Sequence, residues 1–109
     1  MEAPRDQCQF NKQLLNFLET SPTPFHAVNQ ITARLASAGF SYLPEGEAWK
    51  TVPGGHYFTT RNDSSVVAWT MPVHDRLAEA GFRMVGAHTD SPSLKVKPCP
   101  ETHREGHLQ

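Results

Sequence analysis

The sequence predicts an α/β fold that is incomplete, with two helices followed by a hairpin and further sheet strands. Two observations predict the fold class: apolar residues recur at helical spacing as far as residue 40, and from residue 56 onward aromatic and β-branched runs alternate with turn residues. A third observation predicts that the fold is incomplete: no capping or closing element follows the last apolar run. The 109 residues are enough for one small domain.

The first helix is predicted by apolar residues that repeat with helical period after a flexible N-terminus, residues 1–8. These are Phe10, Leu14, Leu15, Phe17 and Leu18. The helix is expected to end before residues 21–24 (SPTP), because proline removes a backbone donor and disfavours helical geometry in the residue before it.

A second helix is predicted to begin within the same SPTP stretch. Thr23 is the expected N-cap, and Pro24 fits the first helical position, where a missing N–H costs nothing. Gly39 suits the left-handed position after the helix, and Phe40 is placed for the apolar contact that accompanies it. The apolar stripe consists of Phe25, Val28, Ile31 and Leu35.

The period then changes to that of strands. HYFTT (56–60) and SVVAWTM (65–71) flank the turn residues 61–64, which predicts a β-hairpin. Residues 72–80 are polar and are expected to form a loop. FRMVGA (82–87) is predicted to be a short buried strand, and LKVK (94–97) a half-buried one.

Composition bounds the class of function. The net charge is −1 and the ten Lys and Arg residues are scattered, which argues against nucleic-acid binding. No stretch approaches the roughly 18 apolar residues of a membrane span, and the first ten residues lack the apolar core of a secretion signal. Cys8 and Cys99 are far apart and are expected to stay reduced. These features predict a cytoplasmic protein with no membrane partner.

The segment GAHTDSPSLKVKP (86–98) carries the main candidate site. It places His88 two residues before Asp90, at the end of the predicted strand 82–87. Because side chains alternate along a strand, the two residues are expected to point the same way. A neutral imidazole binds zinc through one nitrogen, and an acceptor on the other nitrogen fixes the tautomer. His88 is therefore a candidate metal ligand and Asp90 a candidate support for it or a direct ligand.

Other interpretations of these residues stay open. In one, Asp90 caps a turn and His88 is partly exposed. In another, the chain holds a complete mononuclear metal site, which needs at least one more ligand from His26, His56, His74 or the tail. In the tail, THREGH (102–107) has histidines at i and i+4, but its acid is misplaced relative to HExxH. A solvated loop leading into the next strand is the interpretation we favour there.

Residues 88–90 are named the HTD triplet, and two shorter segments accompany it. SPTPFHA (21–27), YFTTRNDSS (57–65) and GAHTDSPSLKVKP (86–98) occur in this order. In this combination the chain resembles the N-terminal part of the aspartyl aminopeptidases, cytosolic metallopeptidases that remove acidic residues from peptide N-termini. The resemblance extends from about Leu14 to the last residue.

The resemblance implies a zinc-peptidase catalytic domain with two zinc ions, in which His88 is a metal ligand and Asp90 supports it as a catalytic residue. The implied substrates are peptides with N-terminal Asp or Glu, and the implied assembly is a homo-oligomer. Residues 9–92 are then the N-terminal part of the catalytic domain, and 93–109 the start of an inserted oligomerisation domain. The general base and the other ligands are expected beyond this chain.

Two functions from different classes follow. The first is a dizinc aminopeptidase, of which this chain is an N-terminal fragment expected to be inactive alone, since His88 and Asp90 supply too few ligands. The second is a small non-catalytic association domain that keeps part of the peptidase fold. In the second, strand edges and apolar faces are expected to be exposed, so the chain is expected to self-associate.

Overall fold

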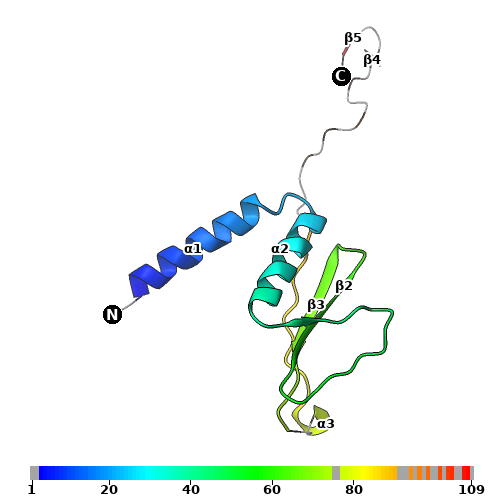
Figure 1. Ribbon diagram of the computed structural model, residues 1–109. Coiled ribbons are helices and arrows are strands. Elements are labelled where there is room, and N and C mark those ends of the chain that lie inside the picture. Colours follow the sequence, from blue (N-terminus) through cyan, green and yellow to red (C-terminus); the bar gives the residue numbers. More distant parts are fainter. Residues whose placement is uncertain are drawn as a thin grey trace.

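The computed structural model describes residues 3–74 and 77–90, together with 94, 96, 98, 101, 103–104 and 107–108. It confirms the predicted order of two helices before a sheet (Figure 1). The elements in chain order are α1 (Ala3–Glu19), α2 (Pro24–Ser37), β1 (Ser41–Tyr42), β2 (His56–Arg61), β3 (Ser65–Thr70), α3 (Leu77–Ala80), β4 (His103–Arg104) and β5 (His107–Leu108).

Helix α1 begins earlier than its apolar pattern indicates. The pattern starts at Phe10, whereas the helix starts at Ala3, so residues 3–8 are helical although we expected a flexible terminus there. Figure 1 shows α1 extending away from α2 and the sheet. The Arg34 guanidinium of α2 connects the two helices: it donates to the Gln13 carbonyl at 3.3 Å and lies 5.2 Å from the centre of the Phe17 ring.

Both ends of α2 form as predicted. The Thr23 hydroxyl accepts from the His26 N–H, and Pro24 occupies the first turn. At the other end Gly39 has φ +86°, and the Phe40 N–H donates to the Leu35 carbonyl at 3.0 Å. This six-to-one bond across a left-handed glycine is a Schellman motif, which satisfies carbonyls that the helix leaves unpaired.

The sheet has the strand order β1-β2-β3. Strands β2 and β3 form the predicted antiparallel hairpin, and the Ser64 N–H closes its turn on the Arg61 carbonyl at 3.2 Å. Asn62 and Asp63 have φ of +51° and +52°, as a type I′ turn requires at both central positions. Strand β1 pairs in parallel with β2 and was not predicted, because two residues are too few to show a period.

The core is small and divides between the two faces of the sheet. Tyr57 and Phe58 are consecutive and therefore point to opposite faces, and both are buried. Phe58 faces α2, where Val28 is buried with it. Tyr57 lies on the other face beside Trp69, with ring centres 5.9 Å apart. The radius of gyration is 20.4 Å, against about 13 Å for a compact chain of this length. The elements therefore do not close around one centre.

The predicted buried strand at 82–87 is wrong. These residues form no strand, and the side chains of Phe82, Met84 and Val85 are 75%, 88% and 101% exposed. A strand requires a hydrogen-bonded neighbour, and no described residue pairs with this segment. Its apolar composition alone therefore does not make it a strand.

Two other segments differ from the sequence predictions or extend beyond what is described. The predicted loop 72–80 contains the short helix α3. In the predicted strand LKVK (94–97), Leu94 and Val96 are exposed and outside any strand, and the two lysines lie outside the described residues. The proposed boundaries after residues 8 and 92 stay predictions.

Candidate functional site

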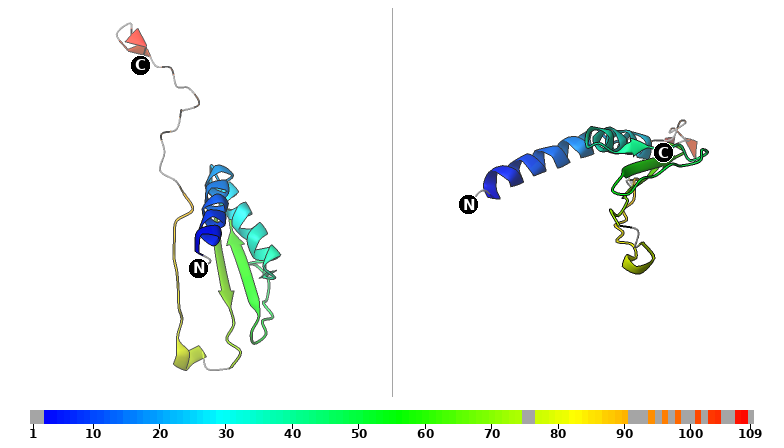
Figure 2. Two further views of the ribbon diagram at one scale, coloured as in Figure 1. Left: turned by 90° about the vertical axis from the view of Figure 1, so that its left-hand side faces the viewer. Right: turned by 60° about the horizontal axis from the view of Figure 1, so that its bottom comes forward.

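The HTD triplet lies where the chain has returned along the sheet. Figure 2 shows the segment after α3 running back beside the hairpin, from the end of β3 toward its start. The Thr89 hydroxyl meets the hairpin turn just before β3, where it donates to the Ser64 carbonyl at 2.8 Å. The candidate site is thus placed next to the turn of the hairpin, although it follows that turn by 25 residues.

His88 and Asp90 face each other as predicted, but at a bend rather than on a straight strand. The backbone bends at Thr89, which brings Nδ1 of His88 to 2.6 Å from the Asp90 carbonyl oxygen and 3.2 Å from its Oδ1. Both of these oxygens are acceptors, so a favourable contact requires Nδ1 to carry the hydrogen. In the neutral ring Nε2 then keeps its lone pair, which is the arrangement of a histidine ready to bind a metal.

Thr89 is the site residue that sequence reasoning missed. It is half-buried, whereas the side chains of His88 and Asp90 are 76% and 72% exposed. The available signal was the alternation of side chains, which places the middle residue of a triplet opposite its two neighbours. The partner was not predictable, because a backbone carbonyl 25 residues away has no sequence signature.

The triplet fits one metal ligand with its support, not a complete site. Within residues 3–74, 77–90 and the few described positions after them, no three His, Cys, Asp or Glu side chains are grouped as a metal requires. A catalytic zinc takes about three protein ligands. The interpretation as a complete mononuclear site therefore has no support in this part of the chain.

The other histidines lie in different places, and His26 and His56 have local contacts of their own. His26 Nδ1 lies 2.8 Å from the Thr23 hydroxyl, at the start of α2. The ring of His56 lies 5.2 Å from that of Phe40, and His74 is exposed between β3 and α3. His103 and His107 lie on β4 and β5, which pair with each other, rather than on one face of a helix.

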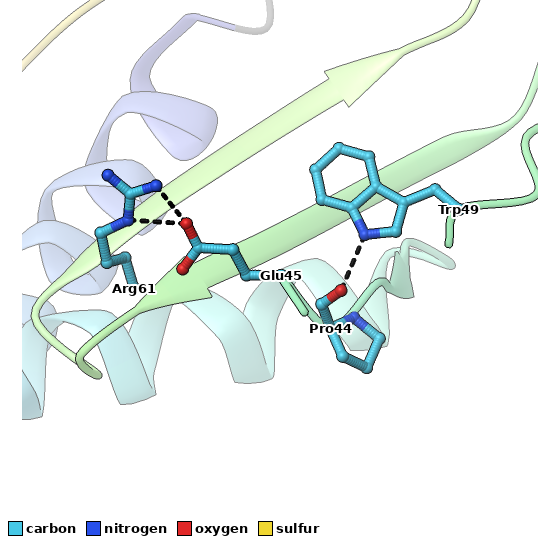
Figure 3. A network of polar contacts seen from close by, with 4 residues as sticks. All are labelled: Pro44, Glu45, Trp49 and Arg61. Carbon is cyan, nitrogen blue, oxygen red and sulfur yellow. Dashed lines mark hydrogen bonds and ion pairs between the residues drawn. The ribbon is translucent and has the colours of Figure 1, made fainter. Parts of the chain in front are cut away.

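A polar network supports the loop 43–55 on the sheet (Figure 3). Glu45, which flanks a turn glycine, accepts two hydrogen bonds from Arg61 at the end of β2. The hydrogen bond lowers the pKa of Glu45 and raises that of Arg61. Nearby, the Trp49 indole donates to the Pro44 carbonyl at 2.7 Å and stacks on Trp69, with ring centres 5.3 Å apart. Neither group lies at the HTD triplet.

Comparison with known proteins identifies the class to which this fold and triplet belong. The family model described as "Aminopeptidase I zinc metalloprotease (M18)" matches residues 17–109. The chain therefore belongs to the M18 aminopeptidase family, whose description names zinc. This confirms the resemblance that the HTD, SPTPFHA and YFTTRNDSS segments indicated.

Individual relatives agree. The chain is 54% identical over 99 residues to the probable M18 family aminopeptidase 2 of Pseudomonas putida (strain GB-1), and this match covers 91% of the chain and 23% of the relative. It is 52% identical over 103 residues to the protein of the same name from Pseudomonas paraeruginosa (strain DSM 24068 / PA7), covering 94% and 24%.

Solved structures show the same fold. The structure titled "Cryo-EM structure of the Ape4 and Nbr1 complex" matches with a TM-score of 0.73 and 40% identity, over 89% of this chain and 19% of that one. "Structure of Chaetomium thermophilum mApe1" matches with a TM-score of 0.56 and 45% identity, over 58% and 15%. The chain thus spans about a quarter of the length of the curated relatives. None of the described helices is long and apolar enough to cross a membrane.

Proposed function

We propose that this chain is the N-terminal portion of a cytoplasmic zinc aminopeptidase that removes Asp or Glu from peptide N-termini, and that it is inactive alone. The observation that carries the proposal is the family match over residues 17–109, which includes the HTD triplet. The preference for acidic residues is supported by the resemblance of the three ordered segments to aspartyl aminopeptidases.

His88 would hold one of two zinc ions through Nε2, since its Nδ1 is already directed at Asp90. Asp90 would fix the ring orientation and the tautomer. When bound, zinc supplies an acidified water and polarises a carbonyl group. The remaining ligands and the general base are proposed to lie outside this chain, because the described residues offer no three-ligand cluster.

A chimera tests the proposal. Residues 1–109 would replace the matched segment of the Pseudomonas putida aminopeptidase, to which the chain is 54% identical. We expect release of Asp from an Asp-containing dipeptide by the chimera and none by the 109-residue chain. In the chimera, His88→Ala should lower kcat/KM by more than 100-fold, and Asp90→Asn by about 10- to 100-fold. Zinc content should fall in the same order.

His74→Ala is the matched control, because His74 is an exposed histidine that lies between β3 and α3 and outside the proposed site. It should leave activity and zinc content unchanged. An active chimera that keeps its zinc and its rate after His88→Ala would contradict the assignment of His88. Activity on neutral but not acidic N-termini would contradict the proposed substrate.

A second candidate function is a non-catalytic association domain that forms homo-oligomers. The observation in its favour is the exposure of apolar side chains on α1, where Phe10, Leu15 and Leu18 are each more than half exposed. Such a surface favours contact with another protein surface. An inactive chimera, together with stable oligomers of the 109-residue chain, would favour this function over the first.

A further inference from the structure

The segment that carries the HTD triplet has little else to hold it in place. Residues 81–88 are all exposed and lie outside any helix or strand. Within residues 81–90 of the described structure, the Thr89 hydroxyl makes the hydrogen bond that reaches the hairpin, at 2.8 Å from the Ser64 carbonyl oxygen in its turn. The position of the whole triplet relative to the sheet therefore depends on this contact.

The acceptor belongs to a regularly hydrogen-bonded part of the fold. Ser64 is the last residue of the type I′ turn, and its own N–H is bonded to the Arg61 carbonyl. The hairpin on either side is paired along its full length, from His56↔Thr70 to Arg61↔Ser65. A side chain bonded to Ser64 is thus attached to the most regular unit of the structure.

The direction of the Thr89 side chain determines the direction of its neighbours. With Thr89 turned inward to Ser64, His88 and Asp90 are left on the solvent side. At the bend, Nδ1 of His88 reaches both the carbonyl and the carboxylate of Asp90. If the triplet rotated about its own axis, the hydroxyl bond would break and both site residues would turn away.

We propose that Thr89 is a positioning residue, whose hydroxyl bond to the Ser64 carbonyl fixes the orientation in which His88 presents Nε2 and Asp90 supports Nδ1. This inference rests on the proposed function of His88 as a zinc ligand. It extends that function to a residue that touches neither metal nor substrate and acts through the backbone of its two neighbours.

The metal-free 109-residue chain, carrying Leu15→Glu and Leu18→Glu to reduce the self-association that exposed apolar side chains favour, gives a test that is independent of catalysis. At a pH well above the usual imidazole pKa of about 6.5, the nitrogen shifts of the His88 ring in NMR report which nitrogen carries the hydrogen. We expect one tautomer, with hydrogen on Nδ1. Thr89→Val keeps the β-branched shape but removes the hydroxyl, and should give a mixture of tautomers. Thr89→Ser keeps the hydroxyl and should retain the single tautomer.

Thr32→Val is the matched control. The Thr32 hydroxyl also donates to a backbone carbonyl, that of Asn29 at 3.0 Å, but it does so within α2. This variant should leave the His88 tautomer unchanged. A single Nδ1–H tautomer in Thr89→Val, with the hairpin amide signals intact, would overturn the proposal. If Thr89→Val loses the hairpin signals, Thr89→Ser decides: a retained tautomer supports the hydroxyl contact, and a lost one overturns it.

The chimera separates failure of this inference from failure of the proposed function. Thr89→Val should lower kcat and zinc retention by about tenfold, the lower end of the range for groups that orient metal ligands, with KM unchanged and with recovery in Thr89→Ser. If His88→Ala abolishes activity while Thr89→Val has full activity and zinc, the positioning role alone is wrong. If His88→Ala has full activity and zinc, the function on which the inference rests is wrong.

Discussion

At the scale of single residues, neighbouring side chains perform different tasks because they leave the backbone in different directions. His88 and Asp90 meet each other in solvent, while Thr89 between them binds the turn of the hairpin. A similar division holds in the loop 43–55, where Glu45 pairs with Arg61 and Trp49 stacks on Trp69. The pairing follows from the end of β2, which brings the guanidinium beside the loop.

The Glu45 pair leads to a prediction about pH. Because Arg61 lowers the pKa of Glu45 in the folded chain, the stability from this pair is fully present above the ordinary pKa of glutamate, about 4.3. That stability is lost as the pH falls through the lowered value. Glu45→Gln should therefore lower Tm slightly at neutral pH and not at strongly acidic pH. Thermal melts across pH would measure this, and a pH-independent difference would contradict it.

Glu47→Gln is the control, because Glu47 lies in the same loop and forms no ion pair with any described residue. Its effect should be small at every pH.

At the scale of elements, the ends of α2 are set by local chemistry, and they position β1. The Schellman motif at Gly39 and Phe40 reverses the chain directly after the helix, and Ser41 is already paired with Tyr57. Three residues thus separate a helix that covers the sheet from a strand that belongs to it. The geometry depends on the left-handed conformation of one glycine.

Gly39→Ala should lower the free energy of unfolding by about 1–2 kcal/mol, the cost of a left-handed conformation for an L-residue. The cost is conformational, because a Cβ at this position meets no atom within 4 Å. Gly46→Ala is a matched control with equally open space and no positive φ. It should be neutral or stabilising by less than about 1 kcal/mol. Denaturant unfolding measures both, and equal effects would contradict the argument.

At the scale of the whole molecule, too much surface is left uncovered. The accessible surface is 9952 Å², whereas a compact protein of 12.1 kDa exposes about 6,000 Å². An open groove of about 530 Å³ between α1 and α2 is lined by Phe10, Leu14, Phe17 and Leu35, among others. A second groove of about 770 Å³ lies between α2 and the sheet, beside Tyr42 and Phe58.

The 109-residue chain should therefore self-associate at micromolar concentration and bind a dye that reports exposed apolar surface. Replacing Leu15 and Leu18 by Glu should reduce association, because both side chains are more than half exposed on α1. Replacing the exposed polar residues Asn11 and Lys12 on the same helix by Glu should not reduce association. Light scattering that shows a stable monomer of the unmodified chain would contradict this prediction.

The parts of the fold that sequence predicted are those set by local interactions. Thr23, Gly39 and the Asn62-Asp63 turn specify their conformations through neighbours a few residues away. The segment 82–87 shows the limit, because its apolar residues favour a strand only where another strand pairs with it. The contact between His88 and Asp90 followed from a spacing of two, whereas the Thr89–Ser64 contact joins residues that no local pattern relates.

The strand order gives the sheet two edge strands of unequal length. One edge strand is β1, with two residues, and the other is β3, with six. A two-residue edge strand is too short to act as a template for another strand, whereas β3 presents a longer row of backbone donors and acceptors. A further strand, from another part of a longer protein or from a second molecule, is thus expected to pair with β3 rather than with β1. The β3 side is also the one along which the chain returns to His88.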